Sequence, residues 1–161
     1  MDLTNIVCTV LSVISTFGST VALINSIYVQ QRLAKRQTTI EAFNILQNEV
    51  LDILVFDKFG NAEIIVENTY NSKCEEAYKA YKTLVARLEH FAVGVNQKVY
   101  DFKVVNKLAG IHLIYLYEKI KPVIDNANKY SHEILYYGEF VKLIDRLKKQ
   151  KNNKQMGEIE K

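Results

Sequence analysis

The pattern of hydrophobic and polar positions divides the chain into one long uncharged run and a series of amphipathic helices. No residue from Leu3 to Gln31 carries a charge. Because a helix that crosses a bilayer needs about 20 mostly apolar residues, this run predicts a transmembrane helix over residues 1–31. A cleaved signal peptide is a poorer interpretation, since Asp2 precedes the run, its apolar core is too long and no small-residue cleavage site is apparent. A buried core helix would rarely stay free of charge for so long.

Small and hydroxyl-bearing residues share one side of this predicted helix, at about 100° per residue. Membrane helices pack through small residues, and serine or threonine can hydrogen-bond across the contact. The stripe therefore predicts helix packing in a homo-oligomer. Two alternatives stay open: a wet surface that lines a pore, or a lone anchor whose hydroxyls bond to their own helix. The candidate pore-lining or helix-packing residues are Asn5, Thr9, Ser12, Thr16, Ser19 and Ser26.

Basic residues follow the uncharged run directly. Arg32, Lys35 and Arg36 lie after its end, whereas its start contributes only Asp2 and the terminal amine. Because lysine and arginine next to membrane helices stay on the cytoplasmic side, we expect a single-pass protein of the bacterial inner (cytoplasmic) membrane. The N-terminus would lie outside and the C-terminus in the cytosol. The three basic residues suit a surface of lipid headgroups.

The rest of the chain predicts an all-α fold, with one small cytosolic helical domain over residues 32–147 and a disordered polar tail over residues 148–161. One proline and six glycines in 161 residues favour long helices over a turn-rich β fold. Capping boxes at Thr38–Glu41 and Ser72–Glu75 predict helix starts, although the first helix could instead continue from the membrane helix. We further expect a loose stretch over 61–71 and a helix from Ser72 to Gly94 or Asn96. After Asp101 we expect helices over 102–108 and 111–121, with a separation or a kink at Gly110 and an end or a bend at Pro122. A last helix is expected over 132–149.

Composition and motifs argue against several classes of function. The net charge of +3 is too mild for a nucleic-acid binder, which would show a dense basic face. The sequence contains no phosphate-binding glycine loop, no H-E-x-x-H and no C-x-x-C. Cys8 would lie in the membrane and Cys74 in a reducing compartment, so we expect no disulfide. We therefore expect no cofactor, no metal site and no catalytic residue.

One group of residues could still carry chemistry, namely Arg87, Glu89 and His90. Arg87 and His90 lie three positions apart and so share a helix edge, where they could bind phosphate or assist RNA cleavage. The favoured interpretation is structural, with Arg87 paired to a carboxylate of another helix at the rim of the core. Antiviral ribonucleases of the HEPN class place a histidine four to six residues after an arginine, and no arginine of this chain has that spacing.

Three sequence patterns resemble a family of small bacterial single-pass membrane proteins of unknown function. The resemblance covers most of residues 30–125 and implies one N-terminal membrane helix and a helical cytosolic domain, without catalytic residues to carry over. The layout is also similar to the membrane accessory proteins of type VI-B CRISPR nucleases, which assemble into membrane pores; this resemblance implies a link to antiviral defence. The patterns are Arg36-Gln37-Thr38-Thr39-Ile40, Leu88-Glu89-His90-Phe91-Ala92-Val93-Gly94-Val95, and Val99-Tyr100-Asp101 followed by Val104-Val105.

Two leading hypotheses of function follow. The first is a homo-oligomer whose N-terminal helices pack around an axis and act as a pore-forming or membrane-perturbing effector. Its partners would be the lipid bilayer and further copies of the chain. The alternative is a membrane-tethered adaptor that binds a cytosolic partner protein through its helical domain. A divergent ribonuclease ranks last, and we expect no direct binding of nucleic acid.

Overall fold

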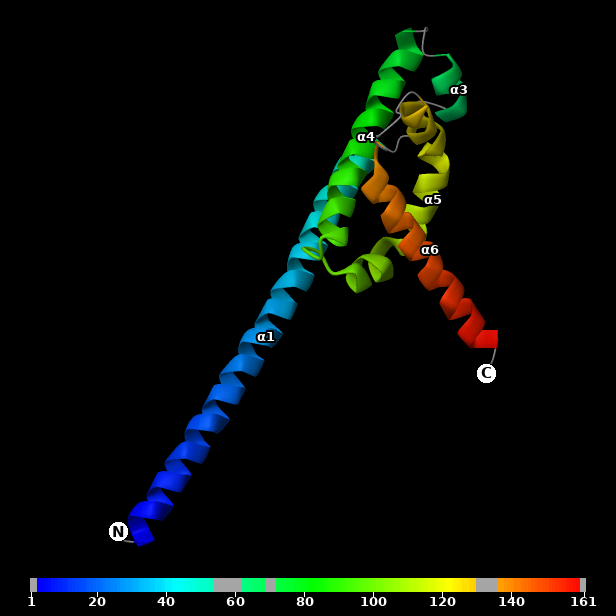
Figure 1. The fold of residues 1–161 in the computed structure, drawn as a ribbon. Coiled ribbons are helices and arrows are strands. Elements are labelled where there is room, and N and C mark those ends of the chain that lie inside the picture. The colour runs from blue at the N-terminus through cyan, green and yellow to red at the C-terminus, as the bar shows by residue number, and fades with distance from the viewer. Residues whose placement is uncertain (1–2, 54–61, 69–71, 130–135, 160–161) are drawn as a thin grey trace. The chain divides into compact units, whose positions relative to one another are not determined.

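The computed structural model describes residues 3–53, 62–68, 72–129 and 136–159. These residues form α-helices, and no strand occurs among them, which confirms the predicted all-α fold class. The helices are α1 (Leu3–Ile53), α3 (Ala62–Glu67), α4 (Ser72–Asn96), α5 (Phe102–Asn128) and α6 (Gly138–Ile159) (Figure 1). Within the part of the chain described, no helix has the combination of length and hydropathy required of a membrane span.

The chain divides into two compact units, Met1–Gln37 and Thr38–Lys161. Helix α1 contributes to both, and it passes through Thr38 without interruption. The open question of whether a helix restarts there is thereby settled in favour of continuity. The predicted capping box at Thr38 and Glu41 is wrong as a helix start, because backbone N–H groups in a helix interior already have acceptors one turn earlier.

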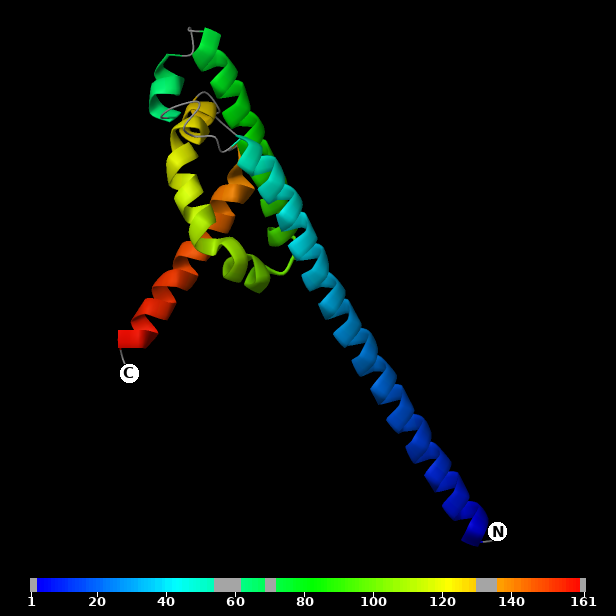
Figure 2. The ribbon, with the colours of Figure 1, turned by 180° about the vertical axis from the view of Figure 1, so that it is seen from behind.

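The second unit has one hydrophobic core, formed mainly by α4, α5 and α6. These three helices contact one another in pairs, and α3 packs against α4 and α5 (Figures 1 and 2). Part of the stretch over 61–71 that the sequence predicted to be loose, including Ile64-Ile65-Val66, belongs to α3. The buried residues follow helical spacing, as expected of helices that bury one face; those of α5 and α6 include Val105, Ala109, Leu113, Leu116, Ile120, Phe140, Leu143, Ile144 and Leu147.

Helix α5 is one continuous helix, where the sequence left open a separation or a kink at Gly110 and an end or a bend at Pro122. Its start is as predicted: Asp101 has extended backbone (φ −84°, ψ 107°), and its carboxylate accepts from the Lys103 N–H at 2.9 Å. The helix then continues through Gly110 and Pro122 to Asn128, so a separation at Gly110 and an end at Pro122 are wrong, while the kink and the bend stay predictions. Proline in a helix interior costs about 3 kcal/mol, and the packing of the fully buried Ile120 and Val123 close to it offsets that cost.

Helix α6 begins and ends later than predicted. It starts at Gly138, directly after Tyr137, whose φ of 64° lies in the left-handed region. The first part of the predicted helix, residues 132–135, lies outside the described residues. The helix then runs to Ile159 and so includes residues 148–159 of the predicted tail, whose disorder stays a prediction. Lysine, glutamine and methionine in this segment are good helix formers, which the low apolar content obscured.

Candidate functional site

The three residues that the sequence groups as a candidate site point in different directions. Arg87 and His90 line an open groove of about 520 Å³ between α1 and α4, whereas Glu89 contacts α6. Consecutive side chains of a helix are rotated by about 100° about its axis, so Glu89 and His90 point in different directions although they are neighbours in the sequence. The structure therefore does not assemble these three side chains into one site. The groove is lined by Ala42, Ile45, Leu46, Ala86, Arg87, His90, Phe91 and Tyr100.

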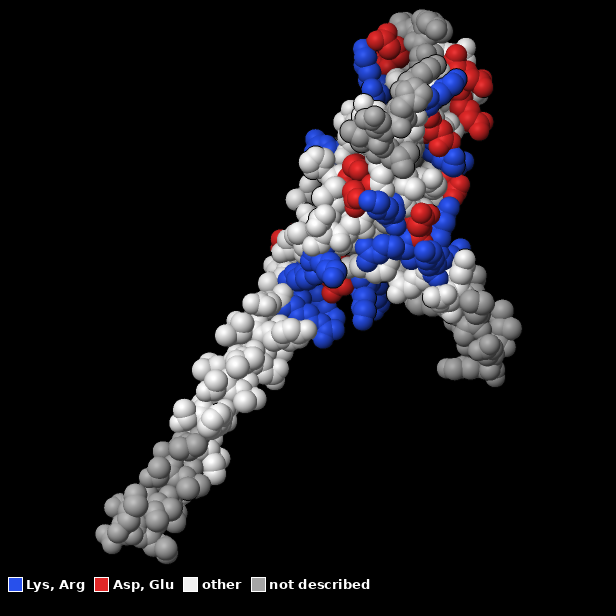
Figure 3. Space-filling model, viewed as in Figure 1, with Lys and Arg blue, Asp and Glu red and all other residues white. Residues whose placement is uncertain are grey.

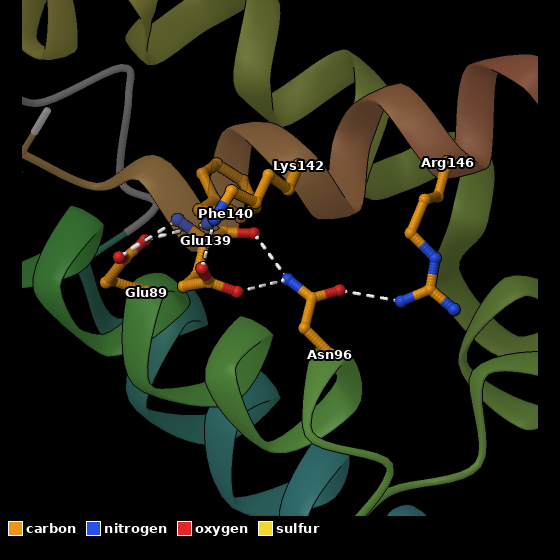
Figure 4. A network of polar contacts seen from close by, with 6 residues as sticks. All are labelled: Glu89, Asn96, Glu139, Phe140, Lys142 and Arg146. Carbon is orange, nitrogen blue, oxygen red and sulfur yellow. Dashed lines mark hydrogen bonds and ion pairs between the residues drawn. The ribbon is translucent and has the colours of Figure 1, made fainter.

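Glu89 caps the start of α6 from the neighbouring helix. The backbone N–H of Glu139 donates to one of its carboxylate oxygens at 3.1 Å, and the N–H of Phe140 donates to the other at 2.7 Å (Figure 4). The first N–H groups of a helix have no acceptor within the helix, and the helix dipole places positive charge there. A carboxylate that accepts from two of them stabilises both the helix and its contact with α4. Sequence analysis missed this role, because 50 residues separate Glu89 from Glu139.

Asn96 joins α4 to α6 two turns further along. Its side-chain N–H group donates to the backbone oxygen and to the carboxylate of Glu139, both at 2.9 Å, and its oxygen accepts from Arg146 at 2.7 Å (Figure 4). The Lys142 ammonium, 2.6 Å from the Glu139 carboxylate, and then the Asn96 amide hold the pKa of Glu139 below its ordinary value. The Arg146 guanidinium also lies 4.2 Å from the centre of the Phe102 ring. These contacts hold helices together and expose no reactive group.

Gly94 allows Tyr100 to lie against α4 at one end of the groove. A Cβ atom at this position would overlap the Tyr100 ring. That ring stacks on Phe91, with centroids 5.5 Å apart, and Phe91 also meets Phe43 of α1 at 6.1 Å. The sequence offered Gly94 as one possible end of the helix, but α4 continues to Asn96. The glycine at position 94 instead allows an aromatic ring to approach the helix backbone closely.

Thr39 fixes the turn between α4 and α5 to α1. Its side chain is fully buried, and its hydroxyl oxygen accepts a hydrogen bond from the backbone N–H of Asp101 at 2.8 Å. Buried polar groups need such partners, because an unsatisfied one costs about 1–3 kcal/mol. The hydrogen bond therefore determines where the turn lies relative to the part of α1 in the second unit.

The structure describes the side chains of half the predicted hydroxyl stripe. Thr16, Ser19 and Ser26 are exposed on α1, and the Ser19 hydroxyl donates to the backbone oxygen of Ser15 at 2.9 Å. Of the predicted membrane-surface residues, Arg32 is exposed, whereas Lys35 and Arg36 are half-buried and have interaction partners. The side chains of Asn5, Thr9 and Ser12 lie outside the described residues.

Metal-binding clusters are absent from the part of the chain that the structure describes: no three histidine, cysteine or acidic side chains come together there. His90 and His112 are exposed on different helices, while His132 lies outside the described ranges. Arg87 is exposed and has an interaction partner. The described residues thus offer the groove between α1 and α4, a second, shallower hollow of about 480 Å³ beside Val66 and Pro122, and several exposed surfaces as candidate binding sites.

Comparison with known proteins gives one match, to a family model. The model is described as "Domain of unknown function (DUF4760)", and it matches residues 12–147. No curated protein and no solved structure matches the chain. The expected family of unknown function is thereby confirmed, while the similarity to CRISPR accessory proteins stays a prediction. Because the match covers most of the sequence, the chain belongs to the DUF4760 family.

Proposed function

We propose that this protein is a membrane-anchored homo-oligomer, held in the bilayer by the N-terminal part of α1. The observation that carries the proposal is the exposure of apolar side chains over this uncharged segment. Phe17, Val21 and Ile24 are 70%, 64% and 62% exposed. Apolar surface in water costs about 25 cal/mol per Å², so a helix that exposes it on several sides needs lipid or further protein around it.

The length of the uncharged run supports the same proposal. Leu3 to Gln31 exceeds the roughly 20 residues that a helix needs to cross a bilayer. The proposal draws on the whole run, including the first residues of α1, whose side chains lie outside the described residues. Arg32, Lys35 and Arg36 support a cytosolic location of the C-terminal side, because basic residues next to membrane helices favour that side. A reporter that is active only outside the cytoplasmic membrane, fused after Lys161, should stay silent; activity there would overturn this orientation.

The hydroxyl stripe supports association between copies through helix packing. Ser19 donates its hydroxyl proton to its own helix at Ser15, so this donor needs neither water nor a second chain. A lone anchor would form the same bond, so association is proposed from the small residues of the stripe, which let helices pack closely. A satisfied hydroxyl can lie in a dry contact between closely packed helices, which favours a packed bundle over a permanently water-filled lumen. Opening of such a bundle into a pore would be a property of an activated state.

The test replaces the centre of the stripe and measures three properties of the same samples. Ser12, Thr16 and Ser19 are changed together to leucine, with Val13 and Val21 changed to leucine as the control on the opposite side. Resistance to alkaline extraction tests the anchor, particle size in detergent tests the oligomer, and ion flux in vesicles tests the pore. We expect both variants to stay in the membrane, and only the first to lose the oligomer, because leucine holds the helix backbones apart.

The outcomes separate the alternatives. Intact oligomers that lose ion flux would support a pore lined by the stripe, whereas a monomeric wild-type particle would overturn the oligomer. Release of the wild type by alkaline extraction would overturn the anchor itself. The link to antiviral defence is tested independently, by counting phage plaques on cells with and without the protein.

The groove between α1 and α4 favours a second candidate function, a membrane-tethered adaptor. Ile45 is 60% exposed at its edge, and the aromatic rings of Phe91 and Tyr100 form part of its lining. Grooves with apolar linings accept the apolar face of a partner helix. A partner that co-purifies in stoichiometric amount should be lost from Ile45→Glu and retained by Asn44→Ala, whose side chain is exposed beside it. Equal retention by both variants would exclude the groove as the binding site.

A further inference from the structure

We propose that the turn between α4 and α5, together with the first turns of α5, forms a second contact with an anionic bilayer surface. This inference rests on the proposed membrane anchor and adds a lipid-binding surface in the second unit of the chain. It differs from the predicted contact of Arg32, Lys35 and Arg36, which belong to the first unit. The basic–apolar surface consists of Lys98, Val99, Lys103, Lys107, Leu108 and Ile111.

Three lysines of this surface form no ion pair with any residue that the structure describes. These are Lys98, Lys103 and Lys107, and all three side chains are exposed. Figure 3 shows Lys and Arg side chains, interspersed with Asp and Glu side chains, on the surface of the second unit. Four other described lysines of the second unit form ion pairs, namely Lys79–Glu75, Lys121–Asp125, Lys142–Glu139 and Lys148–Glu118.

Exposed apolar side chains lie among the three lysines. Val99 is 57% exposed, Leu108 45% and Ile111 69%. Positions four apart share a helix face, so Lys103, Lys107 and Ile111 form one row along α5, and Leu108 lies beside Ile111. A helix face that combines lysine with apolar residues suits the boundary between headgroups and acyl chains. The apolar tips enter the interface, while the long lysine side chains reach the phosphates.

A hydrogen bond tethers this surface to the chain just beyond the proposed anchor. Asp101 lies between Lys98 and Lys103, and its N–H donates to the buried Thr39 hydroxyl at 2.8 Å. Thr39 follows Gln31 by eight residues. Eight residues span about 12 Å as helix and less than ~30 Å when fully extended. The turn therefore stays within reach of lipid headgroups, whatever the orientation of the two units.

An anionic lipid surface is the partner that this chemistry fits. Each lysine near such a surface strengthens binding about fivefold at low salt, and the effect decays over a Debye length of about 10 Å. The exposed apolar residues of the same surface favour entry into the lipid interface, because this removes their side chains from water. The proposal therefore predicts contact that depends on lipid charge and on salt, but that does not decide whether the anchor inserts.

The experiment places a reporter on the surface in the full-length protein. Cys8 and Cys74 are changed to serine, and Ile111→Cys is labelled with an environment-sensitive fluorophore. The protein is reconstituted into vesicles of phosphatidylcholine, alone or mixed with phosphatidylglycerol, that contain a lipid with a quencher in its headgroup. The control label is Glu76→Cys, an exposed position near the other end of α4. We expect quenching at position 111 that rises with phosphatidylglycerol and falls with salt, and little quenching at position 76.

A charge variant with a matched control completes the test. Changing the three surface lysines to glutamine should lower the docking equilibrium on the order of 100-fold, from about fivefold for each lysine. The control changes Lys79, Lys121 and Lys148 to glutamine, which removes the same net charge elsewhere and should leave quenching unchanged.

The result that would overturn this inference differs from the one that would overturn the anchor. A chain that alkaline extraction removes from the vesicles fails as a membrane anchor. A chain that resists extraction, yet shows no charge-dependent quenching at position 111, retains the anchor and refutes the second contact. Shielding of position 111 that depends on protein concentration rather than on lipid charge would assign this surface to another copy of the chain, and would refute the contact as well.

Discussion

The cap that Glu89 supplies to α6 allows a quantitative prediction. Glu89→Ala removes the acceptors of two backbone N–H groups, those of Glu139 and Phe140. Phe140 is fully buried, so water cannot replace the lost acceptor unless the contact between α4 and α6 opens. Loss of a helix cap costs about 0.5–2 kcal/mol, and a hydrogen bond to a charged group contributes about 1.5–3 kcal/mol. Assigning about 1 kcal/mol to the longer bond and about 2 to the shorter, buried one predicts destabilisation of about 3 kcal/mol.

Amide hydrogen exchange measures this loss where it occurs. At 1.4 kcal/mol per factor of ten, local opening at Phe140 should become on the order of 100-fold more frequent. Denaturant unfolding of the full chain in detergent, followed by the helical circular dichroism signal, gives the global value. Glu89→Gln should fall between wild type and Glu89→Ala, because its amide keeps one acceptor but turns an N–H group toward the other donor.

The control is Glu76→Ala, since Glu76 is exposed on the same helix. It should change stability by less than about 0.5 kcal/mol. If Glu89→Ala and Glu76→Ala have equal effects on stability and on exchange at Phe140, the carboxylate does not cap α6, and the account of the contact between α4 and α6 given above is wrong.

Three further predictions concern single positions of the second unit. Gly94→Ala should destabilise it by about 1–3 kcal/mol through overlap with the Tyr100 ring, measured by denaturant unfolding against the exposed neighbour Val93→Ala, which should change little; equal effects would show that the ring moves aside at no cost. Lys98→Gly should stabilise it by up to about 1 kcal/mol, because the φ of 61° at this position suits glycine, and a loss of stability in the same measurement would contradict that. The pKa of Glu139 is lowered in the folded state, so the stability that its carboxylate contributes is present at neutral pH and is lost as the pH falls through its folded-state pKa. Glu139→Gln should therefore narrow the difference between the unfolding midpoints at neutral and at acid pH. An unchanged difference would refute the stabilising role of this carboxylate.

Short-range signals in the sequence predicted the helices well, while long-range packing decided where they end. The Asp101 cap was predictable because donor and acceptor lie two residues apart. The prediction at Pro122 also used local information alone, namely the missing N–H group and the steric clash of proline in a helix. Such information does not include the burial of Val123 and Ile124 against other helices. Helix α5 continues because that tertiary term is larger than the local cost.

The candidate site shows the same limit at the level of side chains. Spacing correctly placed Arg87 and His90 on one edge of α4, where both line the groove. Spacing could not show that Glu89 turns to α6, because its two donors lie 50 and 51 residues further along the chain. The basic–apolar surface was equally hidden. Its lysines look like ordinary solvated charges until the hydrogen bond from Asp101 to Thr39 places their turn beside α1.

The three sequence patterns that carry the family resemblance meet one another in the fold. Thr39, from the first pattern, accepts a hydrogen bond from Asp101 of the third. Phe91 and Gly94, from the second, hold the ring of Tyr100. Contacts among the three patterns thus give these residues a structural role, because each pattern provides a packing or hydrogen-bonding partner for another. This junction also fixes the turn that bears the basic–apolar surface, so the same residues that identify the family position the surface that we propose to meet the membrane.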